Sequence, residues 1–168
     1  MACQAARQLP EEDVCLWSRS ADQLEAIAQS GQNQAYLPGI SLPKSLRLES
    51  DFDAAVKRLG VDDLLVIATP MSGLSEIIAR TLEIADHSLN IVWLCKGLEP
   101  TTALLPHQVV EREDRLHSHG IQHAYGALSG PSFAHEVGSG MPCALTVASS
   151  SERLCKIVQA AFHHGNMR

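Results

Sequence analysis

The 168-residue sequence has no apolar run near the roughly 18 residues that a membrane span requires, and no dense cluster of Lys and Arg. Its first residues, MACQAARQLPEED, lack the apolar core of a signal peptide. The net charge of −6 argues against the electrostatic footprint of a nucleic-acid-binding protein. These absences predict a cytoplasmic protein with no membrane span, whose partner is a small molecule or another protein.

The sequence also has no CxxC pair. Its five cysteines are spread singly along the chain, most of them in apolar surroundings. Two histidine pairs, His117 with His119 and His163 with His164, have no Cys or carboxylate partner at a recognised ligand spacing. The pattern favours buried thiols in a reducing compartment over a disulfide framework, and it argues against a metal site.

Short apolar runs alternate with segments of helical periodicity, which is typical of βα units that build a mostly parallel sheet. The predicted fold class is therefore α/β, in one globular domain. Strands are expected at residues 13–17, 46–48, 63–68, 90–95, 122–128 and 143–148. Helices are expected at residues 2–8, 20–29, 74–84 and 102–119, after Ser50, from Ser132 to Val137, and from a Ser149 cap to Phe162.

Residues directly after an apolar run are candidate ligand contacts, because open parallel sheets bind ligands at the carboxyl ends of their strands. Arg19 follows the first run, where a basic residue either meets a ribose 2′-phosphate or is a solvated surface charge. Lys96 follows NIVWLC, and its ammonium either reaches water or faces an anionic ligand. The turn at residues 69–73 is more simply the start of a helix. The sequence alone leaves the alternatives for Arg19 and Lys96 open.

The segment SGPSFA, residues 129–134, is a further candidate. Gly130 permits close approach of the backbone, Pro131 pre-sets the first turn, and the N–H groups of a helix start at Ser132 could hold an anion. Many helices begin in this way, so the segment by itself is a moderate signal. No G-x-G-x-x-G follows a strand in the 168 residues, so a self-sufficient NAD site is not expected.

The order of VCLWSR, YLPGISLP, DLLVIATP, VWLCKGLEP, LSGPSFAHEV and GMPCALTVAS closely resembles bacterial NAD(P)-dependent glycerol-3-phosphate dehydrogenase over nearly the whole chain. KGLE directly after a strand, followed by SGPSFA, is the most specific part, and it argues against a related dehydrogenase of another small acid. The resemblance implies a Rossmann-like, doubly wound sheet. It also implies hydride transfer between NAD or NADP and dihydroxyacetone phosphate or glycerol 3-phosphate, which supplies the backbone of phospholipids.

The resemblance also implies roles for single residues at a cofactor site. Arg19 would lie beside the adenosine end of NAD or NADP, and Tyr36 in YLPG would border the same end. Lys96 would contact both the cofactor and the substrate. Ala134 would present its backbone to the cofactor.

The small phosphorylated substrate would be held by Lys96, Gly130 and Ser132. Ser132 stands where many relatives have threonine, which keeps the hydroxyl. His135 could transfer a proton, but the resemblance gives it no role, so a histidine on the side of a helix is the favoured interpretation.

Some parts of the family pattern do not occur in the printed sequence. In the family, a first strand and G-x-G-x-x-G-T precede the helix that ACQAARQ resembles, and a helical domain with a general-acid lysine follows. We therefore expect residues 1–168 to be a partial NAD(P)-binding domain, without a catalytic residue and inactive alone. The alternative is a non-catalytic remnant or interaction module. Without a central first strand, two strands would keep unpaired edges, through which the chain could associate with itself.

Overall fold

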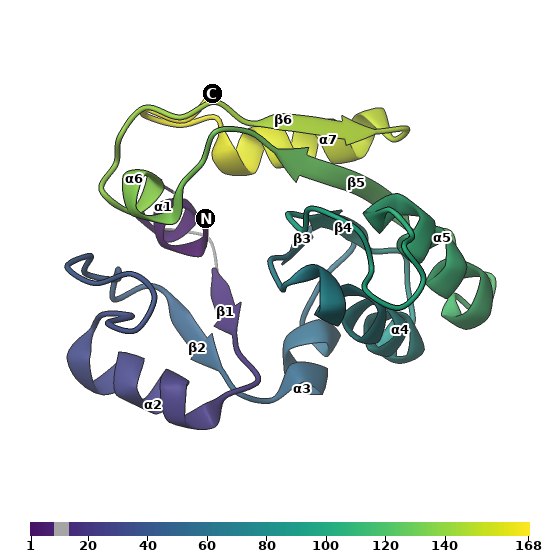
Figure 1. The fold of residues 1–168 in the computed structure, drawn as a ribbon, viewed down its shortest axis with the longest axis horizontal. Coiled ribbons are helices and arrows are strands. Elements are labelled where there is room, and N and C mark those ends of the chain that lie inside the picture. The colour runs from purple at the N-terminus through teal and green to yellow at the C-terminus, as the bar shows by residue number, and fades with distance from the viewer. Residues whose placement is uncertain (9–13) are drawn as a thin grey trace. The chain divides into compact units, whose positions relative to one another are not determined.

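The computed structural model describes residues 1–8 and 14–168, which form two compact units (Figure 1). The first unit comprises residues 1–55, 130–145 and 159–168, and the second comprises residues 56–129 and 146–158. The described helices are α1 (Ala2–Gln8), α2 (Ala21–Ser30), α3 (Phe52–Lys57), the short 3-10 helix η1 (Met71–Gly73), α4 (Leu74–Ile84), α5 (Pro106–His117), α6 (Ala134–Gly138) and α7 (Glu152–Phe162). The described strands are β1 (Cys15–Trp17), β2 (Arg47–Glu49), β3 (Leu64–Ile67), β4 (Asn90–Trp93), β5 (Ala124–Ser129) and β6 (Thr146–Ser149).

The second unit is built on a four-stranded sheet in the order β3-β4-β5-β6. Strands β3, β4 and β5 run parallel, and β6 is antiparallel to β5. Strand β4 is buried along its whole length, as expected of an apolar strand inside a parallel sheet. Helix α4 packs against α5, and its buried residues Leu74, Ile78 and Leu82 recur at helical spacing. These buried residues form part of the core of the second unit.

The part of helix α7 that belongs to the second unit packs closely on strand β5. A Cβ atom at Gly126 would lie 3.3 Å from Cδ2 of Leu154 and 3.2 Å from the carbonyl oxygen of Ala148. At the other end of the sheet, the Asn90 amide donates to the carbonyls of Val61 and Asp63 at 3.0 and 2.9 Å. Small side chains and satisfied polar groups therefore allow close packing on β5 and β4.

The first unit contains a two-stranded parallel sheet of β1 and β2, with Cys15 opposite Arg47. Trp17 at the end of β1 packs edge-on against Phe52, with ring centroids 4.8 Å apart. Helix α2 begins after Ser20, whose hydroxyl accepts the N–H of Gln23 at 3.2 Å. These contacts fix the turn between β1 and α2.

The predicted α/β class and the mostly parallel strand pairing are confirmed. Each predicted helix and strand is present, α1 and α4 with the predicted bounds and the others with shifted ends. Asp13, the predicted start of the first strand, lies outside the described residues. Two predicted helix caps were wrong by one or two residues. Asp51, not Ser50, accepts the first N–H groups of α3 at 2.9 and 3.1 Å, and Ser151, not Ser149, accepts an N–H of α7 at 3.2 Å. The helix cap must lie two or three residues before the N–H that it accepts.

Two boundaries differ from the prediction by three or more residues. Helix α5 begins at Pro106 instead of near residue 102, because the preceding residues close a turn in which the Glu99 N–H donates to the Leu104 carbonyl at 2.9 Å. Proline suits the first helical position, where its missing N–H costs nothing. Strand β6 begins at Thr146 instead of Cys143, since Cys143 forms an isolated bridge with Met167.

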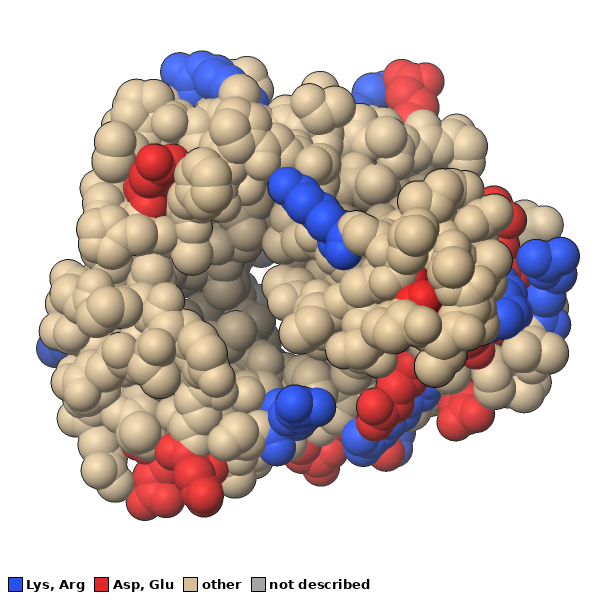
Figure 2. Space-filling model, viewed as in Figure 1, with Lys and Arg blue, Asp and Glu red and all other residues tan. Residues whose placement is uncertain are grey.

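Among the described helices, none is long and apolar enough to cross a bilayer. On the face shown in Figure 2, the Lys and Arg side chains of the described residues lie scattered among Asp and Glu, without one continuous basic patch. Cys3, Cys95 and Cys143 are buried, as predicted for cysteines in apolar surroundings, whereas Cys15 and Cys155 are only half-buried.

Candidate functional site

The carboxyl ends of β3, β4 and β5 form one edge of the sheet in the second unit. Ile67, Trp93 and Ala127 are paired in register across the three strands. The N–H of Leu94 donates to the carbonyl of Ile67 at 2.8 Å, which extends the pairing beyond β4. Lys96 therefore follows β4 at the edge where parallel sheets bind ligands.

The residue before Lys96 locks this edge. The Cys95 thiol donates to the carbonyl of Thr69 at 3.1 Å, and its sulfur lies 3.9 Å from Oγ1 of Thr69. Burial raises the pKa of the Cys95 thiol, so it stays protonated at neutral pH. Cys95 is therefore a structural contact between the ends of β3 and β4, because a nucleophile would need to be a thiolate.

Lys96 is exposed, and the backbone turns sharply after it because Gly97 has a left-handed φ of 93°. Within the described parts of the chain, no ion pair or hydrogen bond occupies its ammonium group. A solvated cation beside a sheet edge can meet an anionic group without first breaking an internal contact.

The loop after Lys96 is anchored by Glu99, the last residue of KGLE. Glu99 is only 7% exposed. Both of its carboxylate oxygens accept from the Arg112 guanidinium of α5, at 2.8 and 2.9 Å, and one also accepts from the Thr102 hydroxyl. These hydrogen bonds, chiefly those from Arg112, lower the pKa of Glu99 to about 2. Glu99 is therefore charged at neutral pH and ties the loop to α5.

The network continues from Arg112 into helices α4 and α5. Arg112 donates to Glu113 at 2.8 Å and to the Ser75 hydroxyl at 3.1 Å, while Ser75 itself donates to Glu113 at 2.8 Å. The carboxylates of Glu99 and Glu113 raise the pKa of Arg112. KGLE was recognisable as a motif in the sequence, but the roles of Glu99 and Arg112 were not. The two residues lie on different elements, and no sequence pattern indicates that they pair.

The SGPSFA segment follows β5 and begins the part of the first unit that contains α6. Gly130 has a φ of 153°, and a Cβ atom there would overlap the carbonyl oxygen of Ala144. Only glycine fits this close approach of two backbone segments. The predicted close approach at Gly130 is therefore present, although it is made to the chain's own backbone.

The predicted helix start at Ser132 was wrong. Helix α6 begins at Ala134 and has five residues, because Phe133 keeps an extended backbone (φ −61°, ψ 136°). Ser132 is half-buried, and its hydroxyl donates to the Gly130 carbonyl at a long 3.4 Å. Its N–H thus lies outside the first helical turn, and what Ser132 offers is a weakly engaged hydroxyl.

Tyr36 lies in a loop that packs on α6. Cβ at Gly138 would lie 3.3 Å from side-chain atoms of Leu37 and Ile40, the neighbours of Tyr36 along this loop. The Tyr36 side chain is 76% exposed. The first unit thereby brings the loop of Tyr36 against the helix that starts at Ala134.

The other predicted contacts are distributed as follows. Arg19 is exposed in the turn after β1, also in the first unit, whereas Lys96 belongs to the second unit. Gly130, Ser132 and Ala134 lie together in one segment of the first unit. A shared crevice for Lys96 and Ser132 stays a prediction.

Known proteins with similar sequences are glycerol-3-phosphate dehydrogenases. The family described as NAD-dependent glycerol-3-phosphate dehydrogenase N-terminus matches residues 1–155. Glycerol-3-phosphate dehydrogenase [NAD(P)+] of Polynucleobacter necessarius subsp. necessarius is 74% identical over 168 residues, which are 100% of this chain and 49% of that protein. The enzyme of Cupriavidus pinatubonensis is 47% identical over 98% of this chain and 48% of its own length.

A solved structure shows the same fold. The glycerol-3-phosphate dehydrogenase of Coxiella burnetii, 29% identical, superposes with a TM-score of 0.85 over 99% of this chain and 48% of its own. The chain spans about half the length of the curated relatives that it matches. Its Rossmann-like α/β fold and the family match lead to one conclusion: the chain belongs to the NAD-dependent glycerol-3-phosphate dehydrogenase N-terminal family.

Proposed function

We propose that this chain forms the nucleotide-binding part of a glycerol-3-phosphate dehydrogenase and contributes binding residues for NAD(P)H and dihydroxyacetone phosphate. One observation carries the proposal: Lys96 is exposed at the carboxyl edge of a parallel sheet, on a loop that Glu99 anchors to α5. This arrangement offers a cation, positioned by its backbone, to an anionic ligand.

The residues present fit NAD or NADP in part. Arg19 offers an exposed cation after β1, which suits the adenosine end of the cofactor, and exposed Tyr36 would border that end. Lys96 would meet the cofactor after β4, and Ala134 would present its backbone. The pyrophosphate needs a glycine loop, and no G-x-G-x-x-G follows a strand in the 168 residues.

The substrate would lie against Lys96, Gly130 and Ser132. The Lys96 ammonium suits the oxygens of a phosphorylated three-carbon alcohol or ketone, and the weakly bonded Ser132 hydroxyl can donate to one of them. When bound, the nicotinamide would donate or accept the hydride. None of the residues to which we assign a role supplies the proton, so we expect no turnover by the 168 residues alone. By this proposal the enzyme works in the cytoplasm and supplies glycerol 3-phosphate for phospholipids.

A segment exchange tests the proposal. This chain would replace the matched half of the Polynucleobacter necessarius enzyme, whose 74% identity favours correct folding. The oxidation of NADH by dihydroxyacetone phosphate would then be followed by the loss of NADH absorbance. We expect an active enzyme. Lys96→Met in this hybrid should lower kcat/KM about 10- to 100-fold, because a charge-assisted contact is lost.

The matched control is Lys156→Met. Lys156 is an exposed lysine of α7 whose only described ion pair is a solvated one with Glu152 at 2.7 Å, and its loss should leave kcat/KM unchanged. An inactive hybrid that is folded would count against the proposed function, and equal effects of the two lysine variants would count against the role of Lys96.

A second proposal is self-association through sheet edges. In the described part of the chain, β1 pairs only with β2, and β3 pairs only with β4. Leu64, Leu65 and Val66 of β3 are only half-buried, so an apolar edge strand with free backbone groups is available for pairing. Sedimentation velocity at increasing concentration should show dimers or larger species. A strictly monomeric chain with a sharp cooperative melt would refute this proposal.

A further inference from the structure

Helix α6 is too short to be stable by itself. It has five residues, Ala134–Gly138, well under the roughly 12 residues at which isolated helices become even marginally stable in water. The N–H groups of the turn after the helix, residues 139–141, donate to the carbonyls of His135, Glu136 and Val137 at 2.8 to 3.1 Å, and further donors to this end come from other segments. The position of the segment that contains Gly130, Ser132 and Ala134 therefore depends on what holds the carboxyl end of α6.

Two side chains of α1 donate to the same end of α6. The Gln4 amide donates to the carbonyl of Val137 at 2.6 Å, and the Arg7 guanidinium donates to the carbonyl of Gly138 at 2.8 Å. Gln4 and Arg7 are three residues apart and therefore share one face of α1. Gln4 is only 7% exposed, so the hydrogen bond that its side-chain amide donates is shielded from water. A cation at a helix carboxyl end is also favoured by the helix dipole.

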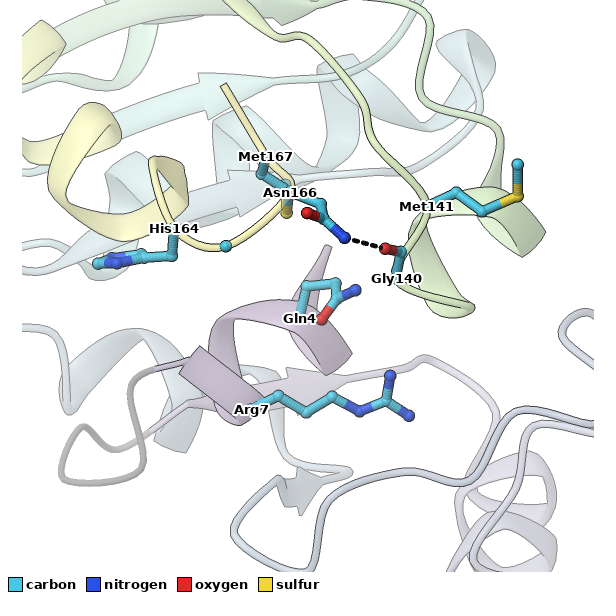
Figure 3. Close-up of a pocket in the computed structure, with 8 residues that line it drawn as sticks. Gln4, Arg7, Gly140, Met141, His164, Asn166 and Met167 are labelled. Carbon is cyan, nitrogen blue, oxygen red and sulfur yellow. Dashed lines mark hydrogen bonds between the residues drawn. The ribbon is translucent and has the colours of Figure 1, made fainter.

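The turn after α6 is held in the same way. Figure 3 shows Gln4 and Arg7 on α1 and, on the facing segment, Asn166, whose amide donates to the carbonyl of Gly140 at 2.8 Å. These side chains line a hollow of about 290 Å³ together with Gly140 and Met141. Donors from two other segments thus add to the backbone hydrogen bonds at the end of α6 and in the turn after it.

Arg7 also reaches the loop that contains Tyr36. Its second terminal nitrogen donates to the carbonyl of Ser41 at 2.7 Å, while the first is bound to Gly138. One planar guanidinium thereby joins the carboxyl end of α6 to the end of the Tyr36 loop. A lysine has a single ammonium group and cannot reproduce this forked contact.

We propose that Gln4 and Arg7 are positioning residues, which hold the Gly130–Ala134 segment and the Tyr36 loop in the arrangement that binds substrate and cofactor. The link to substrate and cofactor binding rests on the proposed function. Neither residue is one to which we assign a contact with substrate or cofactor. Each acts through the backbone carbonyls that it fixes.

Hydrogen–deuterium exchange on the 168-residue chain tests the contacts without any ligand. In Arg7→Met, amides of residues 134–141 and 36–42 should exchange about tenfold faster, whereas Gln4→Leu should affect chiefly residues 134–141. Amides of α4 should be unchanged and serve as an internal control. Arg7→Lys should leave at least one of the two segments unprotected. Full protection of both by lysine would show that charge alone acts and would overturn the positioning role of Arg7.

The hybrid enzyme tests the functional half. Arg7→Met should raise KM for dihydroxyacetone phosphate and for NADH about tenfold, with a smaller change in kcat. A loss of active protein with both KM values unchanged would indicate a merely structural role and would overturn the inference. If the unmutated hybrid is folded but inactive, the proposed function fails, and the exchange measurement still decides whether Gln4 and Arg7 fix the two segments.

Discussion

Glu99→Gln is expected to lower the free energy of unfolding by about 2–3 kcal/mol. The neutral glutamine amide has one acceptor oxygen in place of two. Arg112 therefore keeps its charge but loses the bidentate carboxylate that binds it at 2.8 and 2.9 Å. The Arg112 side chain is about one-third exposed, and water replaces part of the lost contact. Urea unfolding, followed by tryptophan fluorescence and by circular dichroism, measures the loss.

The pH dependence of the same pair gives an independent check. The folded pKa of Glu99 is about 2, below its ordinary value of 4.5. The stabilisation by ionised Glu99 is therefore fully present above about pH 4.5 and is lost as the pH falls toward 2. The difference in unfolding free energy between the unmutated chain and Glu99→Gln should shrink over this interval. A difference that stays constant down to pH 2 would contradict the assignment.

Glu152→Gln is the matched control for Glu99→Gln. Glu152 also forms an ion pair, with Lys156 at 2.7 Å, but both side chains are largely exposed. Surface pairs of this kind contribute no more than about 0.5 kcal/mol. A comparable loss in both variants would mean that the Glu99 pair is no stronger than a surface pair.

In the hybrid enzyme, Glu99→Gln should also weaken substrate binding, because the loop after Lys96 loses its anchor.

Gly130→Ala is expected to cost about 3 kcal/mol or more, or to prevent the first unit from folding. Its Cβ would overlap the carbonyl oxygen of Ala144, and neither backbone segment can yield as a flexible side chain would. The φ of 153° adds strain, because residues with a Cβ atom rarely adopt this backbone conformation. Denaturant unfolding in a Trp93→Phe background, where the fluorescence comes from Trp17 of the first unit, measures the effect.

Gly39→Ala separates strain from overlap. Gly39 also has a positive φ, of 78°, but a Cβ atom there would meet nothing within 4 Å. It should cost only the roughly 1–2 kcal/mol of a left-handed alanine. If the two variants are equally unstable, backbone conformation explains the loss and the approach of Gly130 to Ala144 does not.

Helix α4 shows why part of the fold could be predicted. Its bounds, Leu74–Ile84, agree with the sequence because the periodicity of its apolar residues and the turn before it act within one segment. The cap at Ser20 was predicted for the same reason. Helix α6 shows the opposite case: its start at Ala134 follows an extended Phe133, and its carboxyl end is held by contacts from α1, which no local pattern encodes.

The candidate site divides in the same way. Placing Lys96 and Gly130 directly after strands needed only the apolar runs and the rule that parallel strands end at one edge. Pairing Glu99 with Arg112, or Arg7 with the carbonyls of Gly138 and Ser41, needed the packed structure. Those partners are far apart in sequence, and donors and acceptors on separate elements carry no mutual spacing.

The sequence by itself determined the α/β class, the order of strands and helices, and the residues that follow the strand ends, because hydrophobic periodicity and turn chemistry act over a few neighbouring residues. Only the tertiary structure decided how those strand-end segments are held. Glu99 is buried against Arg112, and α6 is fixed by Gln4 and Arg7, because a buried polar group must find a partner wherever the folded chain brings one within reach.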